Sequence, residues 1–342
     1  MGMTESIARQ LTLQGLEEVR RQTSLSTSSL AVRNRKLNRV EAAHALLSEL
    51  PTKEDLAFLH SGLCQTCLPH SRPASNQDIW TRASGRFSLL VTPGIIDDRK
   101  HGVRHRQPTP EQKEAMFVGV PYGTKARLIM IHLQTEGLRS RTVSLGPSLS
   151  AYLRSLGLPV TGGARGSIGA IREQCLRLAR CTFSMQWSDV SESGEERTII
   201  SDTRLVDGLE LWRAGQDGDW CGTVELSQKF HEHLRDHAVP LDKRGIAHLS
   251  GNSLGLDLYA LFAYRLPRLA RDLYLSWEAL QEQIGTDYAE MRDLAKKVRA
   301  VLPDVHVAYP HAKVEVLPGG LRMKKSRPAV PEKTLVSGYR SI

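Results

Sequence analysis

The sequence predicts an α+β protein that is mainly helical and contains one structural unit twice. Beyond residue 115, two segments of similar length show the same order of predicted elements: helix, helix, helix and hairpin. The third predicted helix of each segment has an apolar stripe opposite a face of small, polar or basic residues. The 342 residues include 46 Lys and Arg against 37 Asp and Glu, a net charge of +9. This balance makes a polyanion the first partner to consider.

The first fifty residues are predicted to form a basic and mobile arm. A stretch rich in Ser and Thr precedes a polar helix that runs to Leu50. That helix carries a cluster of four cations, Arg33, Arg35, Lys36 and Arg39.

Residues 51–114 are predicted to be a connector or a small subdomain. Thr52 and Asp55, which follow a proline, resemble a helix start with a capping box, so we expect a short helix through His60. The remainder is rich in Pro, Gly, Ser and charged residues, and it contains one strand-like run at 87–92.

Residues 115–236 contain the first repeated segment. Apolar spacing predicts three helices, at 124–138, 148–157 and 164–180. A strand at 181–187, a polar tip at 188–197 and a return strand are predicted to form the hairpin, and 223–234 closes the segment.

Residues 237–328 contain the second repeated segment, followed by a tail at 329–342. Its helices are predicted at 253–269, 275–285 and 287–302, and 305–328 is predicted to form strands around a Pro-Gly-Gly turn. Three helices that end in a hairpin follow the plan of a winged helix. The sequence therefore predicts tandem winged-helix domains with β-hairpin wings.

A helix that enters the major groove must bury one stripe and present the other to DNA, and both third helices fit this requirement. In the first, the apolar stripe is Ile168, Ile171, Cys175 and Leu178; in the second it is Met291, Leu294, Ala295 and Val298. The opposite faces and the basic hairpin of the second segment supply the predicted DNA-binding residues, which are Arg165, Ser167, Arg172, Arg177, Arg180, Arg292, Lys296, Lys297, Arg322, Lys324 and Lys325. The alternative is that these residues only form solvated helix faces.

Three stretches of the chain resemble the plasmid-encoded RepA family of replication initiators. VPYGTKARLIMIHLQTE (120–136) is similar to the opening helix of that family, and SGNSLGLDLYALFAYRL (250–266) to its longest motif, from which it departs at Phe262. LHSGLCQTCLPH (59–70) resembles an upstream segment. The resemblance spans about residues 55–328.

The resemblance implies a protein without catalytic activity that binds double-stranded DNA at repeated sites of a plasmid origin. It also implies that the protein helps to open the duplex, recruits host helicase or initiator proteins, and represses its own promoter. The runner-up function is a winged-helix transcriptional regulator without initiator activity, and a homodimer is left open. No cofactor and no metal are expected.

Three catalytic or metal-binding alternatives were weighed against DNA binding. The string around Ser253 matches the G-x-S-x-G nucleophile elbow, with Asp304 and His306 or His311 downstream, but the parallel strands that this elbow needs are missing. Cys64, Cys67 and His70 have the spacing of half a zinc site. His231 and His233 resemble the paired histidines of nicking enzymes. No Walker A string occurs.

The cysteines and the amino terminus favour a cytoplasmic protein. The five cysteines, Cys64, Cys67, Cys175, Cys181 and Cys221, show no disulfide framework. The amino terminus lacks the apolar region of a signal peptide, and no apolar run is long enough for a transmembrane helix. We therefore expect no membrane partner.

Overall fold

The computed structural model describes residues 7–26, 29–96, 111, 114, 116–146, 148–161, 166–190, 196–210, 222–285, 288 and 290–339. About 52% of the chain is helical and 20% is strand, which confirms the α+β class. The chain divides into two compact units. Unit 1 comprises Met1–Ala57, Val239–Gln281 and Asp287–Ile342, and unit 2 comprises Phe58–Ala238 and Glu282–Thr286. The units interleave along the chain, whereas the sequence predicted consecutive segments.

Unit 1 begins with three helices, where the sequence predicted a mobile arm. They are α1 (Ile7–Gln14), α2 (Leu16–Ser24) and α3 (Leu30–Ser48). One small core joins them to helix α13 (Met291–Ala308) and consists of Leu11, Val19, Val40, Ala43 and Val307. The part of the chain that the sequence predicts as an arm therefore has three helices that pack on α13. The sequence could not indicate this packing because Val307 lies far along the chain from the other four residues.

An ion pair also joins α3 to α13. Arg39 donates from Nε and Nη2 to the two carboxylate oxygens of Asp304, at 2.6 and 2.7 Å. His248 Nε2 lies 3.2 Å from the same carboxylate. Burial alone would raise the pKa of Asp304, but the hydrogen bonds from His248 and Arg39 hold it well below its usual range. The pair is mostly buried and bidentate, which makes it stronger than an exposed one.

We expect Asp304→Asn to loosen the three amino-terminal helices. The substitution leaves Arg39 without a carboxylate partner, at a cost of about 2 kcal/mol of unfolding free energy at neutral pH. Urea denaturation and limited proteolysis between α3 and β1 would measure the effect. Asp293→Asn, an exposed change on the same helix, is the matched control. Equal unfolding and cleavage of the two variants would contradict the prediction.

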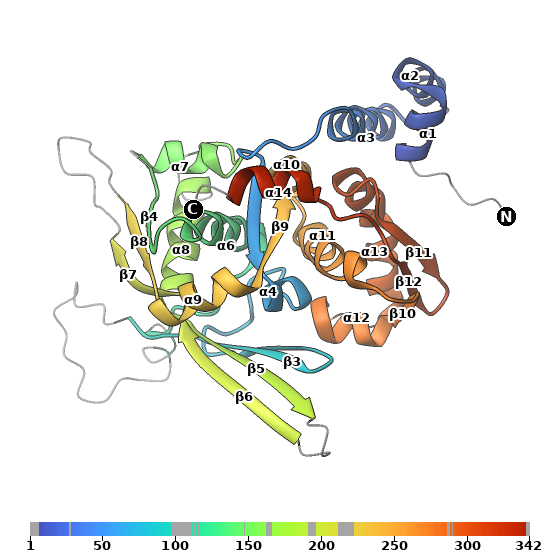
Figure 1. The fold of residues 1–342 in the computed structure, drawn as a ribbon. Coiled ribbons are helices and arrows are strands. Elements are labelled where there is room, and N and C mark those ends of the chain that lie inside the picture. Colours follow the sequence, from blue (N-terminus) through green and yellow to red (C-terminus); the bar gives the residue numbers. More distant parts are fainter. Residues whose placement is uncertain are drawn as a thin grey trace, which may run out of the picture. The chain divides into compact units, whose positions relative to one another are not determined.

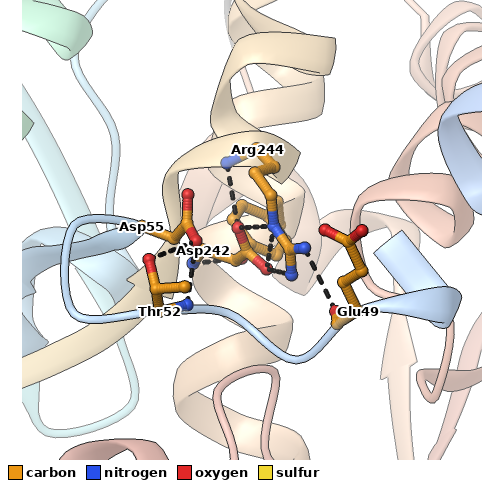
Figure 2. A network of polar contacts seen from close by, with 6 residues as sticks. Glu49, Thr52, Asp55, Asp242 and Arg244 are labelled. Carbon is orange, nitrogen blue, oxygen red and sulfur yellow. Dashed lines mark hydrogen bonds and ion pairs between the residues drawn. The ribbon is translucent and has the colours of Figure 1, made fainter. Parts of the chain in front are cut away.

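The chain between Thr52 and His60 forms a turn followed by strand β1 (Leu56–His60). The short helix that the sequence predicts there is therefore wrong. Thr52 does make the expected contacts, because its N–H and its hydroxyl both donate to Asp55 Oδ2 at 2.8 Å. These bonds close a turn and do not start a helix. Figure 2 shows them beside Asp242, whose carboxylate accepts from the N–H and the guanidinium of Arg244. The predicted hydrogen bonds between Thr52 and Asp55 therefore form, but the apolar residues that follow them are a strand and not a helix.

Asp242 also begins a helix, because its side chain caps α10 (Lys243–Leu249). The Arg244 guanidinium donates to the carbonyl of Glu49 at 3.1 Å, and the N–H of Lys243 donates to the carbonyl of Asp55 at 2.8 Å. These bonds fix residues 49–55 against the start of α10 (Figure 2).

The carboxyl-terminal part of unit 1 is a module of helices and a three-stranded sheet. Its elements are α11 (Ser253–Arg265), β10 (Leu273–Ser276), α12 (Trp277–Ile284), α13, β11 (Lys313–Leu317) and β12 (Gly320–Lys324). The sheet is antiparallel with the order β10-β12-β11 (Figure 1). A 3-10 turn (Leu266–Arg268) follows α11, and α14 (Glu332–Tyr339) follows the sheet. The sequence did not predict β10, because this four-residue strand runs directly into α12.

Unit 2 contains the same order of elements with one insertion. The module consists of α6 (Gly123–Gly137), β4 (Thr142–Ser144), α7 (Leu149–Ser155), α8 (Ser167–Arg180), β7 (Val206–Glu210) and β8 (Thr223–Leu226), and its sheet has the order β4-β8-β7. In both modules the first strand therefore pairs with the third. The insertion lies between α8 and β7. Unit 2 also contains α4 (Ser61–Gln65) and α9 (Gln228–His237), and the chain re-enters unit 1 within β9 (Ala238–Asp242).

The inserted hairpin was predicted to be the first wing, and this prediction is wrong. Its strands β5 (Thr182–Val190) and β6 (Glu196–Arg204) form a four-stranded antiparallel sheet with β2 (Trp80–Ser84) and β3 (Phe87–Thr92), in the order β2-β3-β5-β6 (Figure 1). Leu89 pairs with Met185 and Val91 with Phe183, and all four side chains are buried. The predicted strand at 87–92 is confirmed, but its partner strand could not be read from the sequence.

Within the described ranges, no helix is both long enough and apolar enough to cross a bilayer.

Candidate nucleic-acid interface

Helix α13 has the exposed cationic face that the sequence predicted. Leu294, Ala295 and Val298 are buried as expected, and Arg292, Lys296 and Lys297 are exposed. Helical periodicity separates these two sets, because residues three and four apart share a face. Arg292 lies 2.6 Å from Glu290 in an ion pair whose two side chains are 78% and 53% exposed, so the pair contributes little. Among the described residues, neither Lys296 nor Lys297 forms an ion pair.

Arg299, which the sequence analysis did not select, extends this face by one more turn. It is exposed, and its guanidinium carbon lies 5.4 Å from the centre of the Trp277 ring. Its spacing of three and seven residues from Lys296 and Arg292 could have identified it. The exposed face of α13 therefore carries four cations, Arg292, Lys296, Lys297 and Arg299.

The hairpin of β11 and β12 adds further positive charge in unit 1. Arg322 and Lys325 are exposed and Lys324 is half-buried. Glu315 lies 3.6 Å from Arg322 and 3.1 Å from Lys324, and it neutralises one of these two charges. The cations of α13 and of this hairpin belong to one compact unit and to one module.

Helix α8 of unit 2 presents fewer cations than predicted. Arg172 and Arg180 are exposed, and Arg165 lies outside the described residues. The expected exposure of Ser167 is wrong, because its hydroxyl accepts from the N–H of Thr161 at 3.0 Å while its own N–H donates to the Thr161 hydroxyl at 2.9 Å. These reciprocal bonds fix the amino-terminal end of α8.

The expected exposure of Arg177 is also wrong, because its side chain is only 3% exposed. Its guanidinium donates to the carbonyl of Val120 at 2.9 Å and to Asn76 Oδ1 at 3.3 Å, and it forms an ion pair with Glu173 at 2.9 Å. Gly119 has a φ of 72°, and a Cβ there would lie 2.2 Å from Arg177 Nη1. Arg177 is therefore an internal anchor for the residues that precede α6.

Arg180 faces a different environment at the end of the same helix. It lines a cavity of about 350 Å³ together with Arg204 and Asp207. The apolar part of the lining comes from Leu176, Ala179, Val206 and Leu209. Arg172 and Arg180 are thus the only predicted DNA-binding residues of α8 that are exposed within the described part of unit 2.

The motif at 120–136, which resembles the opening helix of the family, stabilises the fold. Arg127 is buried, and its guanidinium donates to the carbonyls of Leu68 at 2.6 Å and Pro69 at 3.1 Å. The N–H of Gly123, at a φ of 74°, donates to the same Pro69 carbonyl at 2.9 Å. The motif that opens α6 therefore holds the segment around Pro69.

The long motif at 250–266 is structural as well. Asn252 caps α11 by accepting from the N–H of Gly255 at 3.0 Å. Tyr259 is fully buried, and its hydroxyl accepts from the N–H of Asp242 at 2.8 Å. Ser253 begins α11 after another helix and a turn, whereas a nucleophile elbow follows a strand.

The described geometry brings together two of the three predicted zinc ligands, because the ligand atoms of Cys67 and His70 lie within 4.8 Å of each other. Cys64 Sγ lies 3.8 Å from the carbonyl of Leu59, and Cys64 does not join Cys67 and His70 in a group of close ligand atoms within the described residues. His231 and His233 are two residues apart on α9, so a helix directs them to different sides. His233 is not simply exposed, because its Nδ1 lies 2.7 Å from His60 Nε2.

The fold and the exposed cations define a class of protein: a basic α+β protein with two copies of one helix and sheet module. Residues 120–279 match the family model described as plasmid encoded RepA protein. The match confirms the resemblance for the motifs at 120–136 and 250–266. The segment at 59–70 lies outside it.

Two solved structures are similar to this chain, and no curated protein sequence matches it. One is a crystal structure of selenomethionine derivatives of domains 2 and 3 of RctB, with 13% identity, coverage of 78% of this chain and 98% of the other, and a TM-score of 0.45. The second is a crystal structure of RctB domains 2 and 3, with 15% identity, coverage of 81% and 100%, and a TM-score of 0.43.

Proposed function

We propose that this protein is a plasmid replication initiator that binds duplex DNA at repeated origin sites through two winged-helix modules. It promotes opening of the origin and recruits host helicase or initiator proteins in the bacterial cytoplasm. The family match over residues 120–279 supports the role in plasmid replication. The observation that carries DNA binding is the cationic face of α13, which belongs to the same unit as a basic hairpin.

The topology of the modules supports the winged-helix assignment. Each module has the order helix, strand, helix, helix, strand, strand, and in each sheet the first strand pairs with the third. In such a module the third helix enters the major groove, and the hairpin contacts the backbone beside it. In unit 1 this arrangement assigns base and phosphate contacts to Arg292, Lys296 and Lys297, and phosphate contacts to Arg322, Lys324 and Lys325.

The two modules are expected to contribute unequally. In unit 1 the exposed face of α13 carries four cations, whereas α8 of unit 2 exposes only Arg172 and Arg180 among its predicted residues. Next to the sheet of unit 2, Arg141 is paired with Glu225 and lies 3.8 Å from Asp207, so its charge is largely balanced. We infer that the module of unit 1 supplies most of the affinity and that α8 adds contacts at a neighbouring part of the site.

Footprinting on the plasmid DNA that flanks the gene tests the proposal. Periodic protection at direct repeats, weakening steeply with salt, is the expected result, together with maintenance of a minimal plasmid that carries the gene. Protection confined to the promoter, without maintenance, would identify the alternative, a transcriptional regulator. Absence of protection at any site would contradict DNA binding itself.

Removing two cations of α13 is expected to weaken this binding. The slope of log K against log salt is negative, and Lys296→Ala combined with Lys297→Ala should reduce its magnitude by about 2 if both side chains contact phosphates. Fluorescence anisotropy with a labelled origin repeat at several salt concentrations would measure the slope. The control is Lys53→Ala with Lys333→Ala, which removes the same charge from other exposed positions of unit 1. Equal slopes for the two double variants would place the interface elsewhere.

A further inference from the structure

The outer face of the sheet in unit 1 has a composition that duplex binding does not explain. Leu275, Val314, Leu321 and Met323 are buried on its inner face. The pairing register places Tyr274 opposite Arg322, Arg322 opposite Glu315, and Lys313 opposite Lys324 on the other face. Side chains alternate along a strand, so these five residues lie together. The outer face therefore combines one aromatic ring with three cations and one carboxylate.

Tyr274 is unusually accessible for an aromatic residue. Tyr274 is 53% exposed as a residue on β10, whereas Tyr152, Tyr259 and Tyr309 are fully buried. Its hydroxyl lies over the turn between β11 and β12, where a Cβ on Gly319 would come within 2.4 Å of the Tyr274 oxygen. A glycine at this position thus lets the ring lie along the sheet surface, beside Arg322.

The charges around the ring favour a polyanion. Lys313 and Arg322 are exposed and Lys324 is half-buried, and Glu315 is the single acid that the register places among them. Glu315 lies within 4 Å of both Arg322 and Lys324, so one carboxylate is shared between two cations. The face retains a net positive charge of two.

An exposed ring surrounded by cations fits an unpaired base better than a base pair. In a duplex, both faces of each base are already stacked within the helix. An unpaired base can stack on an aromatic side chain while its phosphates lie along neighbouring cations. An acidic protein would satisfy the cations but would not require the exposed ring.

We propose that the outer face of the β10-β12-β11 sheet binds single-stranded DNA, with Tyr274 as the stacking platform and Lys313, Arg322 and Lys324 as the phosphate contacts. The inference rests on the proposed function, because opening an origin exposes such a strand. This surface shares Arg322 and Lys324 with the proposed duplex interface and adds Tyr274 and Lys313, which that interface does not use. Glu315 weakens DNA binding at this surface, because its carboxylate forms ion pairs with Arg322 and Lys324.

Anisotropy with the full-length protein tests the proposal, using a labelled oligothymidine and a labelled duplex origin repeat. Tyr274→Ala should weaken oligothymidine binding by about tenfold, which is the typical contribution of one stacked base. Tyr274→Phe, which keeps the ring, should bind as the unmodified protein does. Glu315→Gln should strengthen oligothymidine binding, a gain that misfolding cannot imitate. Tyr274→Ala should leave duplex binding unchanged.

Five results would overturn the proposal. An equal loss of duplex and oligothymidine binding in Tyr274→Ala would make the face part of the duplex interface. Unchanged oligothymidine binding in both Tyr274→Ala and Glu315→Gln would place single-strand binding elsewhere. Displacement of oligothymidine by polyglutamate at equal charge would indicate an acidic protein partner. Duplex binding without any oligothymidine binding would reject this inference and leave the proposed function standing, whereas binding to neither would reject both.

Discussion

Arg177→Ala is expected to destabilise unit 2 by about 3 kcal/mol, although the sequence placed this residue on the exposed face of α8. The substitution removes a charged donor from the carbonyl of Val120 and from Asn76, and it leaves the Val120 carbonyl buried without that partner. It also leaves Glu173 without its ion-pair partner and opens a space beside Tyr122, whose ring centre lies 5.0 Å from the guanidinium. Loss of charged hydrogen bonds and loss of packing add to one another here.

Arg180→Ala is the matched control, because it removes the same side chain three residues further along the helix. Arg180 is exposed, so its unfolding free energy should stay within about 0.5 kcal/mol of the unmodified protein. Urea denaturation measures both effects, and anisotropy with an origin repeat measures binding. We expect Arg180→Ala to weaken binding without unfolding the protein. If Arg177→Ala unfolds normally but loses specific binding, Arg177 contacts DNA in the complex.

Acidification is expected to destabilise unit 2 through a cluster of histidines. His60 is fully buried, and its Nδ1 accepts from the N–H of Gly62 at 3.1 Å. The proton of the neutral ring therefore sits on Nε2, which donates to Nδ1 of His233 at 2.7 Å. Burial, followed by the nearby imidazoles of His233 and His237, lowers the pKa of His60 to about 3. A proton added to either bonded ring would remove the acceptor on which this arrangement depends.

The sign of the pH effect follows from the lowered pKa. Below the ordinary value of 6.5 the unfolded chain binds a proton at His60 that the folded protein does not bind. The stabilisation is complete above pH 6.5 and is lost as the pH falls from 6.5 towards 3. At pH 5 the loss from His60 alone is about 2 kcal/mol. His233 adds to it, because burial and the nearby His237 lower its pKa as well.

Urea denaturation at pH 7.5 and pH 5 would measure this loss. His60→Gln should lower the stability at pH 7.5 but reduce its dependence on pH, because no titrating group remains at this position. His231→Gln, on the same helix as His233, should retain the full dependence. If the stability of His60→Gln depended on pH as strongly as that of the unmodified protein, the loss of stability at low pH could not be assigned to His60.

Several elements could be predicted from the sequence because their own residues determine them. The helices α6, α8 and α11 begin and end within a few residues of the predicted positions, and β3 coincides with the predicted strand. Apolar periodicity also predicted three buried residues of α13 correctly, Leu294, Ala295 and Val298, whereas Met291 is half-buried. Each of these elements has one strongly apolar side, which periodicity reports directly.

The predictions that failed depended on which segments meet. The sequence predicts a helix where β1 lies, because the turn at Thr52 and Asp55 makes the same hydrogen bonds as a helix start. The hairpin of β5 and β6 was taken for a wing, because nothing local indicates that β3 pairs with it. The pairing register of a sheet is decided by the partner strand, which can lie about a hundred residues away.

The sequence by itself determined the basic α+β character of this protein, the three helices of each repeated segment and the motifs that resemble one family. Only the tertiary structure decided which of the predicted cations are available to a ligand. Lys296 and Arg177 occupy comparable polar positions in their helices, yet Lys296 faces solvent whereas Arg177 is enclosed by Val120 and Asn76. Periodicity reports which side of a helix is apolar, but the exposure of a charged side chain depends on what distant segments place beside it.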